Sequence, residues 1–340
     1  MERVASGTPE LEARLRRRLG RCVTHTDVPG VGPPERGKAR DVYRRGERVA
    51  LVSTDRVSAF DSGVCSVPFK GQAVSQCSAW WHHIAHAESS VPLSSSLLAS
   101  PHPSVTLMQA CSPLPVELVV RAFVAGSTST SLWHAYSQGF RSFCGHSLPD
   151  GLSKHDRLPQ PIVTPTTKSD AGDQSISAEQ IITSGLVSTD EWHLAERAAL
   201  SLFALGQSVA EQNGLLLADT KYEIGRDANG QLMLIDEIHT PDSSRWWAAD
   251  TFEERKAAGQ EPESLDKELL RQWMKQHSEP YTSNTMPEPP DELRLELSRR
   301  YIHLYECITG SQFEPADDGN DERQSPNASV EAAIQKALEE

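Results

Sequence analysis

The stretch Leu215–Thr240, LLLADTKYEIGRDANGQLMLIDEIHT, decides the fold. Two apolar runs, LLLA and LMLI, stand on either side of the dipeptide Asn229-Gly230, which is the strongest short signal for a β-hairpin turn. If this dipeptide forms a two-residue turn, the pairing of the two strands places Glu223 directly opposite Asp236. The stretch therefore predicts an antiparallel hairpin that carries two facing carboxylates.

Two facing carboxylates repel each other unless a cation lies between them. Mg²⁺ prefers hard oxygen ligands, so Glu223 and Asp236 are predicted metal ligands in a site that handles phosphate groups. Strand alternation also places Asp219, Lys221 and Glu223 on one face of the hairpin. Two alternatives stay open: a solvent-facing hairpin with a salt-bridged lysine, and a longer turn that shifts the register.

The rest of the chain mixes extended and helical patterns. The patterns predict a hairpin over 37–54, helices over 72–88, 188–214, 265–277 and 291–309, and a strand over 115–126. Ser188 and Glu191 are expected to form a capping box at the start of their helix. Residues 139–178 are rich in Pro, Gly and Ser and are a candidate binding loop. Hairpins come first along the chain, and helices are interspersed later. This order predicts an α+β fold with two lobes and a cleft between them.

The composition excludes several classes of protein. The 340 residues carry a net charge of −14, which argues against binding to nucleic acid through phosphate neutralisation. No apolar run is long enough to span a membrane, and the first residues lack the apolar core of a signal peptide, so a cytoplasmic protein is expected. The six cysteines include no C-x-x-C pair and suggest neither a zinc cluster nor a disulfide framework.

Residues 32–39, GPPERGKA, nearly match the phosphate-binding pattern G-x-x-x-x-G-K-[ST]. Ala39 stands where a hydroxyl group must bind Mg²⁺, two prolines remove amide donors, and no apolar strand precedes the loop, so a P-loop is excluded. What remains is a Gly37-Lys38 turn that opens a hairpin, in which Lys38 or Arg40 would face a triphosphate. A tight surface turn with solvated basic residues is the alternative.

Arg121 interrupts the apolar run VELVVRAFVAG, and a buried arginine needs an anion or another hydrogen-bonding partner. The hydroxyl-rich loop Ser127–Ser131 follows and suits a phosphate or a carboxylate. The string TPDSSR, residues 240–245, places Asp242 and Arg245 just after the hairpin. The alternative for Arg121 is a half-exposed edge position from which its charge reaches solvent. The alternative for Asp242 is an Asx cap in a turn.

The string HHIAH places His82 and His86 four residues apart on a predicted helix. Histidines at this spacing can bind a metal, but no glutamate accompanies them as in H-E-x-x-H. A solvated or packed helix face is therefore favoured over a metal site.

Six strings, in this order along the chain, resemble the SAICAR synthetase family: GKARDVY, TDRVSAFD, PVELVVRAFVAGS, LPQPIVTPTTKSD, LADTKYEIG and LIDEIHTPDSSRWW. The resemblance runs from about Arg36 to about Tyr281 and is similar to the longer variant of plants and some bacteria. It implies a two-lobed fold with a kinase-like nucleotide-binding lobe. It also implies the ATP-dependent ligation of L-aspartate to carboxyaminoimidazole ribonucleotide, a step of purine biosynthesis that uses Mg²⁺.

The resemblance implies roles for individual residues. The matching positions are Gly37, Lys38, Arg40 and Glu117 for ATP; Glu223 and Asp236 for the metal; Arg121, Ser127, Lys168, Asp173 and Arg245 for the substrates; and Lys221, Asp219 and Asp242 for catalysis. Gly172 replaces a histidine that is often found in the family, and Ala122-Phe123 replaces Gly-Tyr. Neither departure removes a charge that the chemistry needs. The base that deprotonates the aspartate amine stays open, with Asp219 preferred.

The resemblance also implies a division of the chain. The expected segments are an N-terminal extension (1–30), a nucleotide-binding lobe (31–115), a substrate and metal lobe (116–309) and an acidic tail (310–340). The tail holds eight acidic and two basic residues, which is typical of a linker, and a short surface helix is expected from about Ser329. The expected partners are small molecules only, and assembly into a homo-oligomer stays open.

Two other functions stay open on the same motifs. An ATP-dependent phosphotransferase on this scaffold would release ADP with a hydroxyl acceptor and would not need aspartate. A nucleotide-binding regulator that has lost activity is suggested only by the departures at Gly172 and Ala122.

Overall fold

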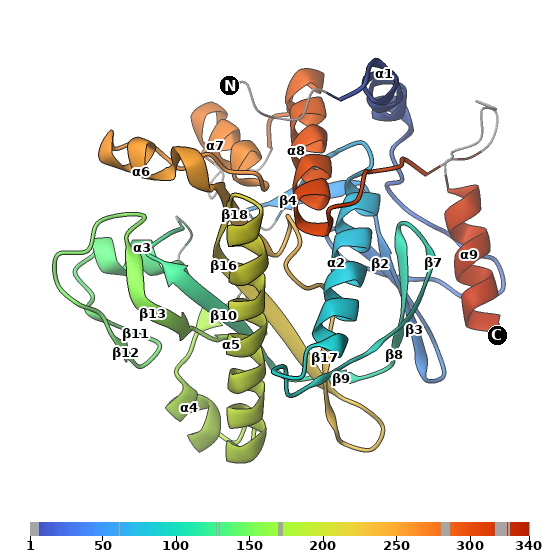
Figure 1. Ribbon diagram of the computed structural model, residues 1–340. Helices are drawn as coiled ribbons and strands as arrows, with labels where there is room; N and C mark the ends of the chain where they lie inside the picture. Colours follow the sequence, from blue (N-terminus) through green and yellow to red (C-terminus); the bar gives the residue numbers. More distant parts are fainter. Residues whose placement is uncertain are drawn as a thin grey trace.

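Two β-sheets, each packed against its own hydrophobic cluster, form the centre of the molecule, and helices cover them (Figure 1). The computed structural model describes residues 7–60, 62–126, 128, 130–168, 173–279, 286–316, 325 and 327–339. Helices and strands are mixed along the chain, and most of the strand pairs are antiparallel. The α+β class that the sequence predicts is therefore confirmed.

The smaller sheet is antiparallel and lies in the N-terminal part of the chain. Its strands, in spatial order, are β1 (Glu35–Arg36), β2 (Arg40–Arg45), β3 (Arg48–Ser53), β8 (Val105–Gln109) and β7 (Leu97–His102). β2 and β3 form the hairpin predicted over 37–54, because Arg45 pairs with Arg48 across a two-residue turn. Gly46 in this turn has a φ of 58°, which glycine adopts without strain.

Helices α2 (Lys70–Ala87) and α9 (Ala328–Glu339) flank the five-stranded sheet on opposite sides (Figure 1). α9 contributes four buried apolar residues, which are Val330, Ile334, Ala337 and Leu338. They join a cluster with Tyr43 and Val52 of the sheet. The helix expected from about Ser329 therefore begins at Ala328, and it packs against the sheet instead of standing free on the surface.

The larger sheet has nine strands. They are β15 (Gln174–Ser175), β14 (Thr166–Thr167), β10 (Val116–Phe123), β16 (Leu215–Arg226), β17 (Leu232–Ile235) and β6 (Ser94–Ser95) in order, with β13 (Arg157–Val163) beside β10, and β18 (Ser244–Ala248) and β9 (Ser112–Pro113) beside β16. β10, β16 and β18 are its central strands. They carry most of the residues that the sequence singles out, so this sheet positions the candidate site.

Helix α5 (Thr189–Gln212) covers one face of the larger sheet. Its N-cap is Ser188, whose side chain forms the predicted capping box with Glu191, and Gly214 follows its end with a φ of 68°. The buried face of α5 includes Ala195, Ala198, Ala199 and Gly206, and such small side chains let the helix lie close to the strands. The opposite face of the sheet is therefore the one that remains for polar residues.

The remaining elements surround the two sheets. They are α1 (Pro9–Arg18), a 3-10 turn (Leu19–Arg21), α3 (Leu132–Ser137), α4 (Ala178–Thr183), α6 (Ala249–Ala257), α7 (Glu268–His277), α8 (Asp291–Thr309), and the strand pairs β4 (Arg56–Ala59) with β5 (Ser62–Ser66) and β11 (Ser142–Phe143) with β12 (His146–Ser147). α7 and α8 match the predicted helices, whereas α1 and α6 were not predicted. The strands β11 to β15 lie within the stretch 139–178, which the sequence suggested as a candidate binding loop.

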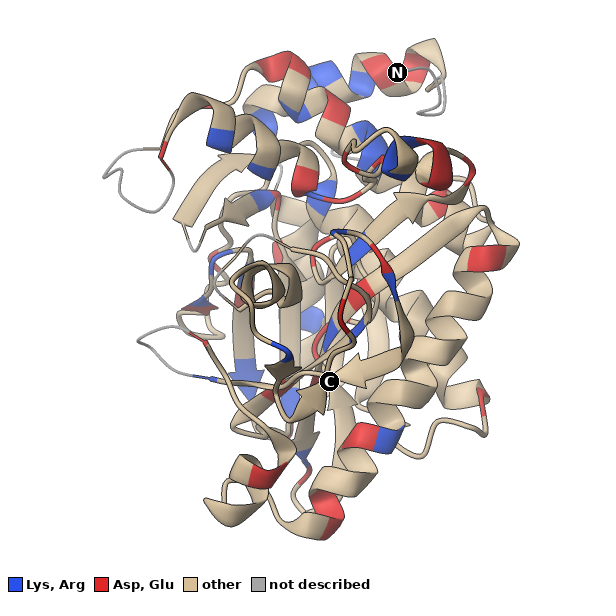
Figure 2. Cartoon of the chain, turned by 90° about the vertical axis from the view of Figure 1, so that its left-hand side faces the viewer, with Lys and Arg blue, Asp and Glu red and all other residues tan. Residues whose placement is uncertain are grey.

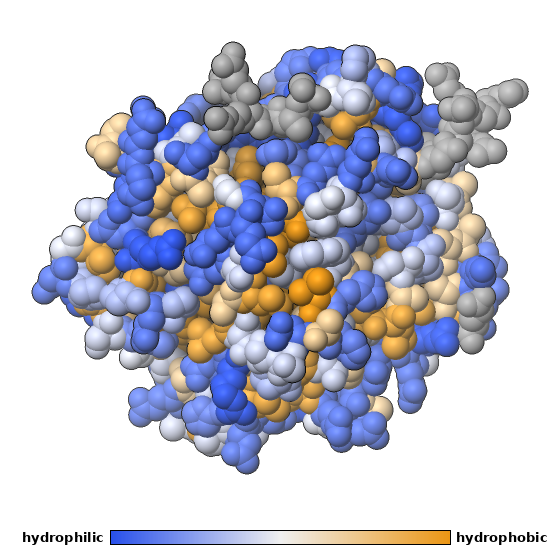
Figure 3. Space-filling view, in the orientation of Figure 1, coloured by the Kyte–Doolittle hydropathy of each residue, from blue (hydrophilic) through white to orange (hydrophobic). Residues whose placement is uncertain are grey.

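The surface alternates between polar and apolar residues. Figure 3 shows a largely hydrophilic face with apolar patches between the charged groups. Within the described ranges, every helix is too short or too polar to cross a lipid bilayer.

Candidate functional site

The hairpin β16–β17 differs from the prediction by one residue in register. Glu223 pairs with Ile235, and Asp236 lies just past the end of β17 with a φ of 64°. Five residues, 227–231, connect the two strands, and the N–H of Asp227 donates to the carbonyl oxygen of Gln231 at 2.9 Å. The side chain of Asp227 accepts hydrogen bonds from the backbone N–H groups of Asn229 (2.9 Å) and Gln231 (2.8 Å). The predicted direct pairing of Glu223 with Asp236 is therefore wrong.

Six charged residues nevertheless share one face of the larger sheet. Strand pairing places Arg121 opposite Asp219, and Asp219 opposite Arg245. Directly paired residues and those two positions apart point to the same side, so the six are Glu117, Arg121, Asp219, Lys221, Glu223 and Arg245. Figure 2 shows acidic and basic positions along the strands at the centre of the molecule.

Lys221 lies among carboxylates. Its Nζ is 2.9 Å from Oε1 of Glu117 and 2.5 Å from Oε1 of Glu223, and Lys168 forms an ion pair with Oε2 of Glu223. Burial alone would lower the pKa of Lys221, but the carboxylates of Glu223, Asp236 and Glu117 outweigh it and raise that pKa. Lys221 is therefore a fixed positive charge.

Arg40 and Asp236 connect the two sheets. The guanidinium of Arg40 in β2 contacts both carboxylate oxygens of Asp236, with 2.8 Å between Nη2 and Oδ2, and it lies 3.5 Å from Oε1 of Glu237. Burial would raise the pKa of Asp236, but Arg40 and then Lys221 hold that pKa well below its usual range. The two predicted metal ligands, Asp236 and Glu223, thus both interact with Lys221 although they are not paired across the hairpin.

A second group of charges lies where β10, β16 and β18 adjoin. Asp219 Oδ2 is 2.6 Å from Nη1 of Arg245 and 3.4 Å from Nη1 of Arg121, and Arg121 Nε donates to Thr164 Oγ1 at 2.8 Å. The buried guanidinium group of Arg121 and the partly buried one of Arg245 therefore share one carboxylate, and Glu268 and Asp266 also act electrostatically on Arg245. Ser127, the predicted hydroxyl partner of these arginines, lies outside the described residues.

Asp242 is held by three side chains from separate elements. Its Oδ2 lies 2.5 Å from Nζ of Lys70 in α2, and its Oδ1 accepts a hydrogen bond of 2.6 Å from the hydroxyl group of Tyr301 in α8. The Nζ of Lys267 is 3.9 Å from Oδ1. Burial would raise the pKa of Asp242, but Lys70 and Lys267 lower it, so Asp242 is a charged carboxylate.

The remaining predicted residues lie at the edges of this arrangement. Gly37 donates its N–H to the carbonyl oxygen of Arg40 at 2.8 Å, and Lys38 is an exposed residue in the same turn. Asp173 is exposed and acts electrostatically on Glu117, so it lies near the carboxylates around Lys221. The structure therefore brings the described predicted residues to two adjoining sheets.

Two residues of the site were not predicted from the sequence. Lys70 stands in the string VPFKGQAV and is buried beside Asp242. The one sequence signal for this burial is that Lys70 is the single charged residue in a largely apolar string. His82 is buried and contacts Ser95 and the backbone of Asp236, whereas His86 is exposed. The interpretation of HHIAH as a packed or solvated helix face is thus confirmed.

The donor chemistry around Lys221 fits Mg²⁺. Glu223, Asp236 and Glu117 offer oxygen ligands only, and all three interact with a single ammonium group. The part of the chain that the structure describes contains no preformed group of three or more metal-binding side chains. Mg²⁺ commonly binds through one or two carboxylates together with substrate phosphates, so these carboxylates suffice for such a site.

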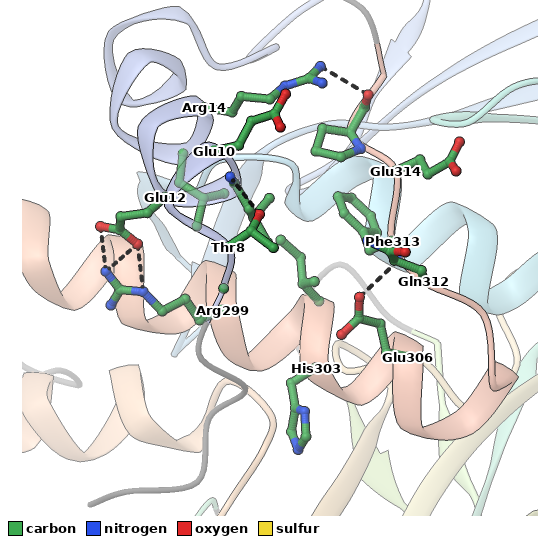
Figure 4. Close-up of a pocket in the computed structure, with 15 residues that line it drawn as sticks. Thr8, Glu10, Glu12, Arg14, Arg299, His303, Glu306, Gln312, Phe313 and Glu314 are labelled. Atoms are coloured by element: carbon green, nitrogen blue, oxygen red, sulfur yellow. Dashed lines mark hydrogen bonds and ion pairs between the residues drawn. The ribbon is translucent and has the colours of Figure 1, made fainter.

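A separate cavity of about 390 Å³ lies between α1, α8 and residues 312–315 (Figure 4). Its wall includes Arg14, Arg299, His303 and Phe313, and none of the predicted site residues lines it. A smaller hollow does border the site, because Gly126 and Arg245 both line it.

Comparison with known proteins identifies relatives over most of the chain. A family model described as SAICAR synthetase matches residues 34–288. A phosphoribosylaminoimidazole-succinocarboxamide synthase of Legionella pneumophila (strain Lens) is 47% identical over 292 residues, which cover 86% of this chain and 92% of that protein. A chloroplastic protein of the same name from Arabidopsis thaliana is 44% identical over 326 residues, which cover 94% of this chain and 78% of that protein.

A solved structure has the same fold. It is described as SAICAR-synthase from Saccharomyces cerevisiae complexed with SAICAR, and it superposes with a TM-score of 0.73 at 28% identity. The superposition covers 86% of this chain and 99% of the yeast chain.

Proposed function

The chain belongs to the SAICAR synthetase family, and from this premise we propose that it ligates L-aspartate to the carboxyl group of carboxyaminoimidazole ribonucleotide. ATP is converted to ADP and phosphate, and the product is the succinocarboxamide SAICAR, an intermediate of purine biosynthesis. A carboxylate is a poor electrophile, so ATP must activate it before an amine can attack. The site must therefore bind three anionic substrates side by side.

The row of charges along the larger sheet carries this proposal. Arg121 and Arg245 share Asp219 at one end of the row, and Lys221 lies between Glu117 and Glu223 further along the same face. Paired guanidinium groups suit a phosphate, whereas a phosphoryl transfer uses a fixed cation and metal-binding carboxylates. Both sets of groups occur on one surface.

We place ATP at the contact between the two sheets. Arg40 supplies a guanidinium group from β2, the Gly37-Lys38 turn precedes that strand, and Glu117 lies on the facing sheet beside Lys221. Lys38 and Arg40 would contact the phosphates, and Lys221 would stabilise the negative charge of the transferred phosphoryl group.

Glu223 and Asp236 would hold Mg²⁺, which when bound neutralises charge that develops on the phosphoryl group. Lys168 and Lys221 contact Glu223, and Arg40, which contacts Asp236, helps to hold the pKa of Asp236 well below its usual range. Charged carboxylates are the form that binds a hard cation.

We place the ribonucleotide phosphate at Arg121, Ser127 and Arg245. Two arginines can each form forked hydrogen bonds with phosphate oxygens, which a lysine could not reproduce. Asp219 holds both guanidinium groups in position.

We place the imidazole carboxylate and L-aspartate near Lys221 and Asp242. Lys168, which forms an ion pair with Glu223, and Asp173, which acts electrostatically on Glu117, would contribute substrate contacts. Asp219, a carboxylate on the same face as Lys221, is the preferred base for the aspartate amine, and it would have to release Arg121 or Arg245 to accept the proton.

The six cysteines are all unpaired, which suits a reducing compartment, and we place the enzyme in the cytoplasm.

The direct test supplies ATP, Mg²⁺, L-aspartate and carboxyaminoimidazole ribonucleotide and measures ADP and SAICAR together. We expect equal amounts of both, and no ADP when aspartate is omitted. Lys221→Met should reduce turnover by about 10²-fold or more. Lys256→Met, which removes a lysine that pairs with Asp156 at 2.8 Å, is the matched control. ADP release with a hydroxyl acceptor and without aspartate would instead indicate a phosphotransferase.

A further inference from the structure

His82 connects helix α2 to the backbone of Asp236. The ring is 1% exposed, its Nε2 lies 2.8 Å from the carbonyl oxygen of Asp236, and its Nδ1 lies 2.8 Å from Oγ of Ser95. Ser95 belongs to β6, which pairs in parallel with β17 directly before Asp236. Helix α2, strand β6 and the residue after β17 therefore meet at this ring, although Asp236 lies 154 positions from His82 in the chain.

The direction of each hydrogen bond follows from the chemistry of the groups. A carbonyl oxygen only accepts, so Nε2 of His82 carries the proton and donates it to Asp236. Ser95 Oγ accepts the backbone N–H of Leu97 at 3.0 Å and has one hydroxyl proton left to donate to Nδ1 of His82. The chain of hydrogen bonds thus fixes both the tautomer and the orientation of the ring.

Asp236 needs such support because its backbone is strained. Its φ of 64° lies in the left-handed region, which residues with a Cβ rarely adopt. The hydrogen bond from His82 fixes the carbonyl oxygen of this residue in that conformation. It thereby fixes the direction in which the side chain of Asp236 points, with its carboxylate toward Arg40.

We propose that His82 is a positioning residue that holds Asp236 in its strained conformation and so places the carboxylate for the metal. This inference rests on the proposed function, in which Asp236 is a metal ligand. His82 does not itself touch the metal or a substrate. Partners that orient metal ligands commonly change metal affinity by 10- to 100-fold when they are removed.

Three variants of α2 separate a positioning role from simple packing. His82→Phe keeps a ring of similar size but removes both hydrogen bonds. His82→Gln keeps an amide N–H that can reach the position of Nε2. His86→Phe is the matched control, because it makes the same change at an exposed position of the same helix.

The main measurement is the binding of Mn²⁺, as a probe for Mg²⁺, to each purified variant with ATP, followed by electron paramagnetic resonance. Thermal unfolding is measured beside it. We expect His82→Phe to weaken Mn²⁺ binding by about tenfold, His82→Gln to restore it to within about threefold, and His86→Phe to bind like the unmodified chain. Ser95→Ala, which leaves the ring in place, should weaken binding on the order of threefold.

A folded His82→Phe variant that binds Mn²⁺ like the unmodified chain overturns the inference. A His82→Gln variant that does not restore Mn²⁺ binding overturns it as well. If His82→Phe does not fold, a Ser95→Ala variant with unchanged affinity for Mn²⁺ overturns it instead. Failure of the proposed function gives a different result, because the unmodified chain would then form no SAICAR, and Asp236→Asn would bind Mn²⁺ as tightly as the unmodified chain.

Discussion

Arg40 and Asp236 form a forked pair of hydrogen bonds, although 196 positions separate them in the chain. Arg40 belongs to the five-stranded sheet and Asp236 to the end of β17 in the larger sheet, so this pair joins the two sheets at the candidate site. A phosphate could replace the carboxylate as the partner of Arg40, and a cation could replace the guanidinium as the partner of Asp236. The pair therefore keeps both groups charged and oriented for the ATP and Mg²⁺ that we propose to bind here.

Arg40→Lys should lower kcat/KM for ATP by about 10- to 100-fold. The ammonium group keeps the charge but cannot form two parallel hydrogen bonds with Asp236 or with a phosphate. Steady-state kinetics with varied ATP measures the change. Arg44→Lys is the matched control, since Arg44 lies on the same strand with its side chain 53% exposed. Equal effects of the two substitutions would contradict a role for Arg40 in binding ATP.

Part of this site could be predicted from the sequence. The polar triplet Asp219, Lys221 and Glu223 lies on one face because strand alternation is fixed by backbone geometry. The capping box at Ser188 was also predictable, because all of its partners lie within one helical turn. Local patterns of this kind need no knowledge of the rest of the fold.

Other features depend on contacts that no local pattern contains. The register of the β16–β17 hairpin shifts by one residue because the connection runs over 227–231 and is capped by the side chain of Asp227, a choice that Asn229-Gly230 alone does not determine. The burial of Lys70 beside Asp242 depends on how α2 packs against the loop after β17. The meeting of Arg40 with Asp236 depends on the packing of one sheet against the other.

Gly126→Ala should raise KM for the ribonucleotide and change KM for ATP little. Gly126 has a φ of 90°, and a Cβ there would lie 2.5 Å from Cβ of Ser131 and 3.1 Å from Nη2 of Arg245. Ser131 would have to shift, and Nη2 of Arg245 would have to give by a few tenths of an ångström. A misplacement of about 1 Å can cost on the order of 10²-fold in rate, so a smaller loss is expected from this smaller shift. Initial rates with each substrate varied in turn measure the effect.

Gly139→Ala separates backbone strain from the contact with Arg245. Gly139 has a similar φ of 93°, but no atom lies within 4 Å of the position of its Cβ. We expect this variant to lose some stability while it keeps the KM for the ribonucleotide. A matching rise in that KM for both variants would show that strain alone explains the effect.

Glu191→Gln should lower the free energy of unfolding at neutral pH but not near pH 2. Hydrogen bonds from Arg226 and then Ser188 lower the pKa of Glu191 from 4.5 to about 2. A carboxylate with a lowered pKa in the folded state stabilises the protein above its unfolded pKa, and this contribution is lost as the pH falls through the lower value. The group is partly exposed, so about 1 kcal/mol is expected at pH 7.

Urea unfolding of both proteins between pH 3 and pH 7 measures this difference. Gln can replace Glu in the capping box, so the substitution tests mainly the charge opposite Arg226. Glu211→Gln, at an exposed position in the last turn of the same helix, serves as the control. A difference between Glu191→Gln and the unmodified chain that stays constant down to pH 3 would argue against the ion pair as its source.

Ile334→Ala should destabilise the protein by about 2–4 kcal/mol, because Ile334 is fully buried between α9 and the five-stranded sheet. The same sheet carries Arg40 in β2, so we also expect a rise in KM for ATP at temperatures where the variant is still folded. Gln335→Ala, one position further along and exposed, should change neither quantity. Thermal unfolding and ATP kinetics on the two variants decide whether the C-terminal helix supports the sheet in which we propose that Arg40 binds ATP. An unchanged Ile334→Ala variant would refute that role.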